Sequence, residues 1–281
     1  QERAGLDIVS DGEIRRESYS NHFATALNGV DLENPGQAVA RSGEPGFVPR
    51  IVGAISRKHA VGIKDLKFLR ANTDRMVKFT VPGPFTMSQQ AQNDFYATDR
   101  EAALDYAAAV NEEIRDLFAA GADVVQLDEP YMQARPEQAR EYGVEALNRA
   151  LDGVSGTTCV HICFGYAALI HERPEGYSFL PELSNTACNH VSIETGQSNL
   201  DCKVLESLEG KHILLGVLDL STEEVESVGL IKKRAKRAMQ YVSADRLLLA
   251  PDCGMKYLSR EAAYGKLCNM VTAGRELREE L

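Results

Sequence analysis

Short apolar runs rich in β-branched residues recur along this chain, and helix-like stretches separate them. Such runs are typical of buried strands, and their alternation with helices indicates βαβ units that share a parallel sheet. The runs that we predict as strands span residues 6–10, 77–81, 123–127, 158–163, 190–193, 212–218 and 246–250. The sequence therefore predicts an α/β fold.

Most of these runs are followed at once by acidic, glycine or proline residues, as in Asp11-Gly12-Glu13 and Pro251-Asp252-Cys253. The active sites of (β/α) barrels lie at this end of the strands. Seven such units fit an eight-stranded TIM barrel without its first strand better than they fit two domains. The chain starts without methionine and reaches a strand-like run by residue 6. We therefore expect residues 1–281 to form one catalytic barrel domain whose first strand precedes Gln1.

Local signals place the starts of several helices. Capping boxes at residues 98–101 and 221–224 each predict a helix start, and a last helix is expected from about Ser259. Residues 27–56 are rich in glycine and proline, which predicts an excursion with one short hairpin.

Charge and hydropathy narrow the choice of partners. A formal net charge of −10 argues against a surface for nucleic acid or an anionic membrane. No apolar run approaches the roughly 20 residues that span a bilayer, and the N-terminus lacks an apolar signal segment. We expect a cytoplasmic protein that acts on a small molecule or another protein, and a homo-oligomer is compatible with the sequence.

Four potential metal ligands follow or end the later strands: His161, Cys163, Glu194 and Cys253. Alternate strand residues share a face, so His161 and Cys163 point the same way with Cα atoms about 6.6 Å apart. Imidazole, thiolate and carboxylate are the donors that zinc takes. The alternative is that His161 and Cys163 pack in the core, as such pairs often do. The other cysteines have no comparable context, and we assign Cys159 to the core of the barrel.

Two further acidic residues, Glu13 and Asp128, follow or end earlier strands. Carboxylates at the mouth of a barrel can bind an ammonium group or transfer a proton. Capping of the next helix is the competing role for both of them.

Ordered fragments of this chain resemble the catalytic C-terminal barrel of cobalamin-independent methionine synthase, as a single-barrel relative. The fragments cover residues 5–13, 83–86, 126–130, 161–163, 192–195 and 251–256. The resemblance implies a TIM barrel of the methionine synthase/uroporphyrinogen decarboxylase type. It also implies an S-methyltransferase of methionine biosynthesis, which moves a methyl group from methyl-folate to the thiol of homocysteine with zinc as cofactor.

The resemblance also assigns roles by position. His161, Cys163, Glu194 and Cys253 correspond to the zinc ligands, and Glu13 and Asp128 to residues that hold the homocysteine ammonium group. A carboxylate is harder than a thiolate or an imidazole, so Glu194 is expected to be the ligand released when the substrate sulfur arrives. Glu194 would then be a catalytic gate as well as a ligand.

One residue departs from the family pattern in a way that affects the methyl donor. The family carries a histidine at the position of Ser221, where it is thought to protonate the folate leaving group. Methyl-folate is a poor donor unless its nitrogen is protonated, so a methyl-corrinoid or another activated donor becomes an alternative. Other readings are a zinc alkyltransferase for another thiol or an epoxide, and a catalytically silent barrel.

Overall fold

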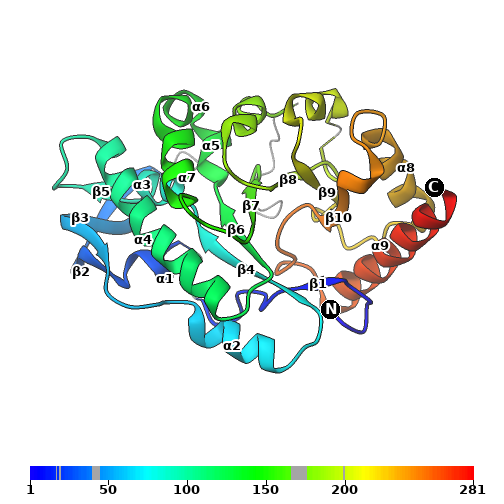
Figure 1. The fold of residues 1–281 in the computed structure, drawn as a ribbon, viewed down its shortest axis with the longest axis horizontal. Helices are drawn as coiled ribbons and strands as arrows, with labels where there is room; N and C mark the ends of the chain where they lie inside the picture. The colour runs from blue at the N-terminus through cyan, green and yellow to red at the C-terminus, as the bar shows by residue number, and fades with distance from the viewer. Residues whose placement is uncertain (17, 19, 40–44, 166–175, 199) are drawn as a thin grey trace.

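The computed structural model describes residues 1–16, 18, 20–39, 45–165, 176–198 and 200–281. Their centre is a parallel sheet of seven strands in the order β1-β4-β6-β7-β8-β9-β10 (Figure 1). These strands span Ile8–Val9, Met76–Pro82, Val124–Asp128, Thr157–Ile162, His190–Glu194, His212–Leu218 and Leu247–Pro251. Each predicted run therefore overlaps one of these strands. The order in the sheet follows the order in the chain, as successive βα units require.

The sheet curls, and residues of both its edge strands, β1 and β10, line one cavity of about 280 Å³. Lys78, Val124 and Leu214 of the strands between them line the same cavity. Val124 and Leu214 also pack with Cys159 in a small apolar cluster, which agrees with the core position predicted for that cysteine. The predicted α/β barrel type is the architecture observed.

A second, three-stranded sheet projects from one end of the barrel (Figure 1). It pairs β2 (Leu27–Val39) antiparallel with β3 (Pro45–Arg57), and β3 in turn pairs with β5 (Gln92–Asn93). The predicted hairpin is thus present but is not short, because each of its two strands has 13 residues.

Helices surround the curled sheet (Figure 1). The α-helices α1–α9 span Asn21–Ala24, Ile63–Ala71, Pro84–Gln89, Asp99–Ala119, Pro130–Ala134, Pro136–Gln138, Val144–Ala150, Val228–Ala238 and Arg260–Glu280. Short 3-10 or π segments span Ala139–Gly143, Leu180–Asn185, Cys202–Leu208 and Ala244–Arg246. In the described ranges, every helix is too short or too polar to cross a lipid bilayer.

Two of the three predicted helix starts are confirmed. The Thr98 side chain accepts a hydrogen bond from the Glu101 N–H at the start of α4, and Ser259 caps α9 in the same way through Ala262. The predicted start at residues 221–224 is wrong, because α8 begins at Val228 under the cap of Ser227.

Long-range hydrogen bonds explain why the segment after β9 is not helical. The Lys266 ammonium of α9 is fully buried and donates to the carbonyls of Asp219 and Glu224. It also pairs with the Glu226 carboxylate, which accepts the Asp219 N–H. These contacts engage backbone groups of the segment from outside it, so the local capping signal does not decide its conformation.

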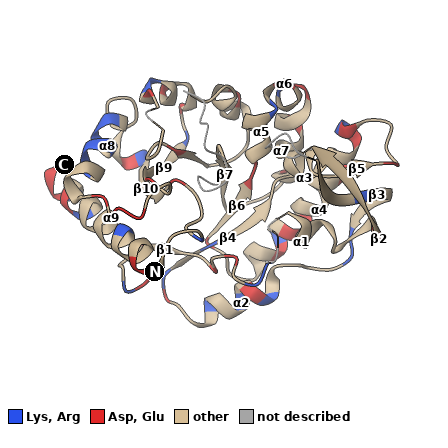
Figure 2. Ribbon diagram, turned by 180° about the vertical axis from the view of Figure 1, so that it is seen from behind, with Lys and Arg blue, Asp and Glu red and all other residues tan. Residues whose placement is uncertain are grey.

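Basic residues of α8 pair with acidic residues near the C-terminal end of α9, and both helices are marked in Figure 2. Lys232 forms ion pairs with Glu276 and Glu280, and Lys236 pairs with Glu280. Arg234 instead turns inward and donates to the Val217 carbonyl of β9. The two helices are therefore linked to each other and to the last part of the sheet.

Candidate metal centre

The C-terminal ends of neighbouring strands bring the predicted site residues to one end of the barrel. Asp128 at the end of β6 is in register with His161 of β7, and His161 is in register with Ser192 of β8. Glu194 ends β8, and its register partner is Gly216 of β9. Cys253 lies two residues beyond β10.

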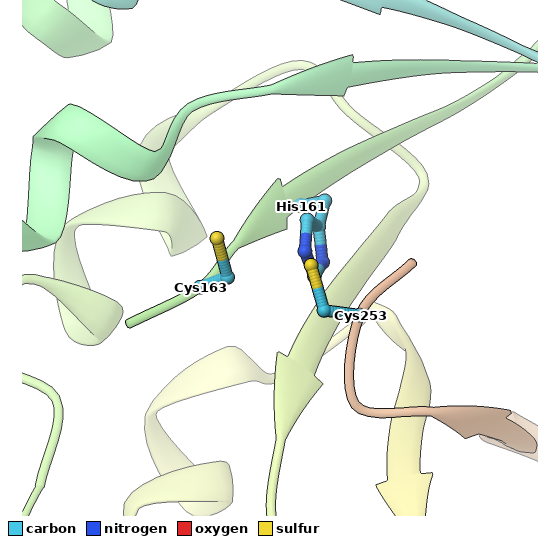
Figure 3. A group of neighbouring side chains, drawn as sticks. All are labelled: His161, Cys163 and Cys253. Carbon is cyan, nitrogen blue, oxygen red and sulfur yellow. The ribbon is translucent and has the colours of Figure 1, made fainter. Parts of the chain in front are cut away.

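Three of the four predicted ligands meet in space. The ligand atoms of His161, Cys163 and Cys253 all lie within 4.8 Å of one another (Figure 3). His161 and Cys163 project from the same strand end, whereas Cys253 reaches them from the segment after β10. Two thiols and one imidazole at this spacing can hold a soft or borderline metal ion.

Glu194, the fourth predicted ligand, is not a member of this three-residue group. Its side chain is 1 % exposed, and its Oε1 accepts a hydrogen bond of 3.2 Å from the Phe164 N–H. Its charge raises the pKa values of both His161 and Cys253, so it acts on the same site. Coordination by Glu194 stays a prediction.

Electrostatics show that the group is short of positive charge. Burial lowers the pKa of His161, but its hydrogen bond with Cys163 and the charges of Cys163, Asp128 and Glu194 outweigh burial and raise that pKa to about 9. The hydrogen bond with Cys163, burial and nearby negative charges hold the pKa of Cys253 well above its usual range. A bound cation would favour the thiolate forms, so the donor set fits a metal ion.

Side chains that the sequence did not single out hold the ligands in place. Ser192 Oγ lies 3.0 Å from His161 Nδ1, which leaves Nε2 of that ring for a metal ion. The Tyr177 hydroxyl donates to the Ile162 carbonyl at 3.0 Å and accepts the Glu194 N–H at 2.8 Å. It therefore ties the end of β7 to the end of β8.

Asp252, beside Cys253, forms a second tie between ligand-bearing segments. Its buried carboxylate accepts the N–H groups of Thr195, Gly196 and Gln197 at 3.2, 2.8 and 2.8 Å. Just before Asp252, the register between β10 and β9 shifts at Pro251. The segments that carry Glu194 and Cys253 are thus locked together.

Glu13 and Asp128 lie beside the three-residue group, and neither caps a helix. Burial, followed by the charge of Asp128, raises the pKa of Glu13 to about 7, and His161 acts on both carboxyls. The next helix after Glu13 is α1, whose N-cap position is Ser20, and the N-cap position of α5 is Glu129. The capping alternative is therefore wrong for both.

The backbone at Glu13 is unusual. Its φ is +56°. Among the residues that the structure describes, Glu13 alone has a positive φ without being a glycine. Asp11 accepts the Glu13 N–H at 3.1 Å, and the Arg16 guanidinium donates to Asp11 and to the Thr80 carbonyl. A left-handed conformation of a glutamate is costly and is typical of functional sites.

Comparisons with known proteins identify the family of this chain. Residues 1–276 match the family model described as the catalytic domain of cobalamin-independent synthase. A protein named methionine synthase from Saccharolobus solfataricus is 31 % identical over 99 % of this chain and 81 % of its own length. One of the same name from Pyrococcus abyssi is 32 % identical over 100 % of this chain and 80 % of its own length.

Two solved structures are similar to this chain over nearly its whole length. A B12-independent methionine synthase from Shewanella sp. W3-18-1, solved in complex with selenomethionine, superposes with a TM-score of 0.93 at 32 % identity. The match covers 100 % of this chain and 85 % of that one. A methyltransferase from Methanosarcina mazei shares the fold, with a TM-score of 0.67 at 17 % identity over 99 % of this chain and 82 % of its own. The chain therefore belongs to the cobalamin-independent methionine synthase family, as its catalytic domain, and is an S-methyltransferase of that type.

Proposed function

We propose that this protein uses zinc to transfer a methyl group to the thiol of homocysteine, which yields methionine. The observation that carries the proposal is the meeting of His161, Cys163 and Cys253 within 4.8 Å, beside the carboxyls of Glu13 and Asp128. In the reaction a bond forms between sulfur and the methyl carbon, the bond from that carbon to the donor breaks, and the thiol proton is released.

Zinc is the metal that we propose, with His161, Cys163 and Cys253 as ligands and Glu194 as the fourth. A set of two thiolates, one imidazole and one carboxylate suits zinc and leaves a replaceable position. Bound there, zinc would lower the pKa of a substrate thiol so that the thiolate is available near neutral pH.

Glu13 and Asp128 would bind the amino-acid end of the substrate. Their two negative charges attract an ammonium group and repel a sulfonate, which favours homocysteine over a sulfonated thiol. The complex of the related Shewanella enzyme with selenomethionine supports a pocket for an amino acid of this size. Because Glu13 and Asp128 are both partly exposed, the ammonium group could reach them and would replace water beside them.

Ser221 affects which methyl donor the protein can use. The Ser221 hydroxyl donates to Asp219 Oδ1 at 2.6 Å and lies in the exposed turn after β9. A hydroxyl cannot act as a proton donor near neutral pH as an imidazolium can. We therefore keep a methyl-corrinoid as the alternative donor to methyl-folate.

The proposal is tested by metal analysis, thiol titration and donor assays on the purified protein. We expect about one zinc ion per chain, proton release on addition of homocysteine, and methionine formation with methyl-folate or methyl-cobalamin offered separately. Absence of zinc after purification from zinc-containing medium would refute the zinc-dependent mechanism.

Glu194→Gln tests the gate separately. The neutral amide is a weaker ligand than the carboxylate, so we expect altered zinc binding and altered alkylation of the thiol. Unchanged zinc content together with unchanged alkylation would show that Glu194 is neither ligand nor gate.

A further inference from the structure

A line of polar side chains runs through the interior of the barrel and ends at Asp128. The Lys78 ammonium of β4 donates to Gln126 Oε1 of β6 at 2.7 Å, and Gln126 Nε2 donates to Asp128 Oδ1 at 2.8 Å. Gln126 and Asp128 share one face of β6, because they are two residues apart in a strand. Lys78, at the end of this line away from Asp128, also lines the cavity between β1 and β10.

The chemistry of Lys78 fixes the direction of both hydrogen bonds. An ammonium group donates and cannot accept, so Gln126 must turn its carbonyl oxygen to Lys78. Its amide NH₂ is then directed to Asp128, where it holds Oδ1. Among the described residues, Gln126 is the side chain that donates a hydrogen bond to the Asp128 carboxylate. This hydrogen bond therefore sets the rotation of that carboxylate.

The charge of Lys78 also acts on Asp128, and on the buried Cys159 thiol, whose pKa it lowers against the effect of burial. His190 lies near Lys78 on the other side, but burial, then His212 and Lys78, lower its pKa to about 4. His190 is therefore neutral at physiological pH and adds no second cation there. The groups of opposite charge that Lys78 influences include Asp128, whose pKa it lowers against the effect of burial.

We propose that Lys78 and Gln126 are positioning residues for substrate selection, which aim the Asp128 carboxylate at the ammonium group of the amino-acid thiol. This inference rests on the proposed function, in which Asp128 binds that ammonium group. A fixed carboxylate loses no rotational freedom when the substrate arrives, so it binds more tightly than a mobile one. The device distinguishes amino-acid thiols from thiols without an amino group.

The experiment compares homocysteine with 4-mercaptobutanoate, which lacks only the amino group. We expect Gln126→Met to raise KM for homocysteine about tenfold and Lys78→Met to raise it about threefold to fivefold, with kcat within about twofold in both. The KM for 4-mercaptobutanoate should stay within about twofold of the wild-type value in both variants. Lys78→Arg keeps a cationic donor and should restore the wild-type KM for homocysteine.

Gln89→Met is the matched control. Gln89 is a buried glutamine that donates to the Tyr142 hydroxyl at 2.6 Å and accepts from Arg135 at 2.7 Å, with no link to Asp128. We expect this variant to be less stable but to keep the wild-type preference between the two thiols. Zinc content and melting temperature, measured for every variant, identify any general loss of structure.

The possible failures are distinguishable. A wild-type protein that methylates both thiols equally well would overturn the assignment of Asp128 to the ammonium group, and with it the role of Lys78 and Gln126. In a second outcome, the wild type prefers homocysteine while Gln126→Met changes the KM for both thiols by the same factor or leaves both unchanged. In that case the proposed function stands and this inference alone is wrong.

Discussion

At the scale of single residues, Glu13 combines a costly backbone with a perturbed carboxyl. Its pKa is raised to about 7 from 4.5 by burial, and then by Asp128. A carboxyl whose pKa is raised on folding destabilises the folded state as the pH rises from about 4.5 to 7. The proposed binding of an ammonium group needs the ionised form, so function and stability place opposite demands on this residue.

The pH dependence of activity should show that Glu13 must be ionised to bind the substrate. We expect kcat/KM for homocysteine to rise with pH up to about 7, because only ionised Glu13 attracts the ammonium group. Glu13→Gln should lower kcat/KM and remove this rise, and rates measured from pH 5.5 to 8.5 would reveal it. A rise that persists near pH 7 in Glu13→Gln would assign it to another group.

The metal ligands can be tested one cysteine at a time. Cys253→Ser removes one of the three donors that lie within 4.8 Å, and we expect its zinc affinity to fall by at least about 100-fold. Competition with a coloured chelator measures this loss. Cys268→Ser changes a half-buried cysteine of α9 and should bind zinc as the wild type does. Full affinity in Cys253→Ser would exclude Cys253 as a ligand.

Residue types and strand periodicity sufficed to bring His161, Cys163 and Cys253 together, because strand ends meet at one end of a barrel. The supporting residues could not be found in this way. Tyr177 acts through backbone groups of two strands, and Asp252 through three successive N–H groups. The sequence does not reveal such partners, because they depend on the path of the folded backbone. The Pro251-Asp252-Cys253-Gly254 fragment was the available signal for Asp252.

At the scale of elements, the tie through Asp252 should be sensitive to a change of one atom. Asp252→Asn can still offer an oxygen to Thr195 and Gly196, but its NH₂ then faces the Gln197 N–H, which needs an acceptor. We expect a loss of about 1–3 kcal/mol in the free energy of unfolding and roughly 10–100-fold weaker zinc binding.

Urea denaturation and chelator competition measure the two effects. Asp245→Asn, at an exposed position of the 3-10 segment before β10, is the control and should change the free energy of unfolding by less than about 0.5 kcal/mol. An Asp252→Asn protein with wild-type zinc affinity would show that this tie does not hold the ligands.

The start of α8 gives a matched pair of serines. Ser227→Ala removes the side chain that accepts the Leu230 N–H and should cost about 1 kcal/mol in the free energy of unfolding. Ser221→Ala removes a hydroxyl from an exposed turn and should cost less than about 0.5 kcal/mol. Equal losses in urea denaturation would contradict this location of the helix start.

The wrongly predicted start of α8 shows that a local capping motif does not always predict where a helix begins. A Ser-Thr-Glu-Glu motif satisfies the pattern of a capping box, but Lys266 and Glu226 bind the backbone of the same segment from elsewhere in the fold. Thr98 and Ser259 meet no such competition, and their helices start as predicted. The length of the β2–β3 hairpin was likewise hidden, because its glycines and prolines resemble those of a loop.

At the scale of the whole molecule, zinc would bridge β7 and the segment after β10, with β8 and β9 between them in the sheet. Binding to the folded state alone adds about 2.7 kcal/mol of stability when free zinc is at 100 times its Kd. We expect chelation to lower Tm by on the order of 5 °C. Cys253→Ser, measured by scanning calorimetry, should show no shift with the same chelator. If chelation leaves the Tm of the wild type unchanged, zinc does not bridge β7 and the segment after β10.

The position of Cys253 beyond the last strand also affects when the metal can be acquired. During synthesis the chain emerges from its N-terminus, so His161 and Cys163 are available long before Cys253. Two donors hold an ion weakly. The third, Cys253, follows the register shift at the end of β10 and is placed at the site only when β10 is paired with β9. A chain that is unfinished, or whose last strand is out of register, would therefore release a bound metal ion, and only the completed sheet would retain it.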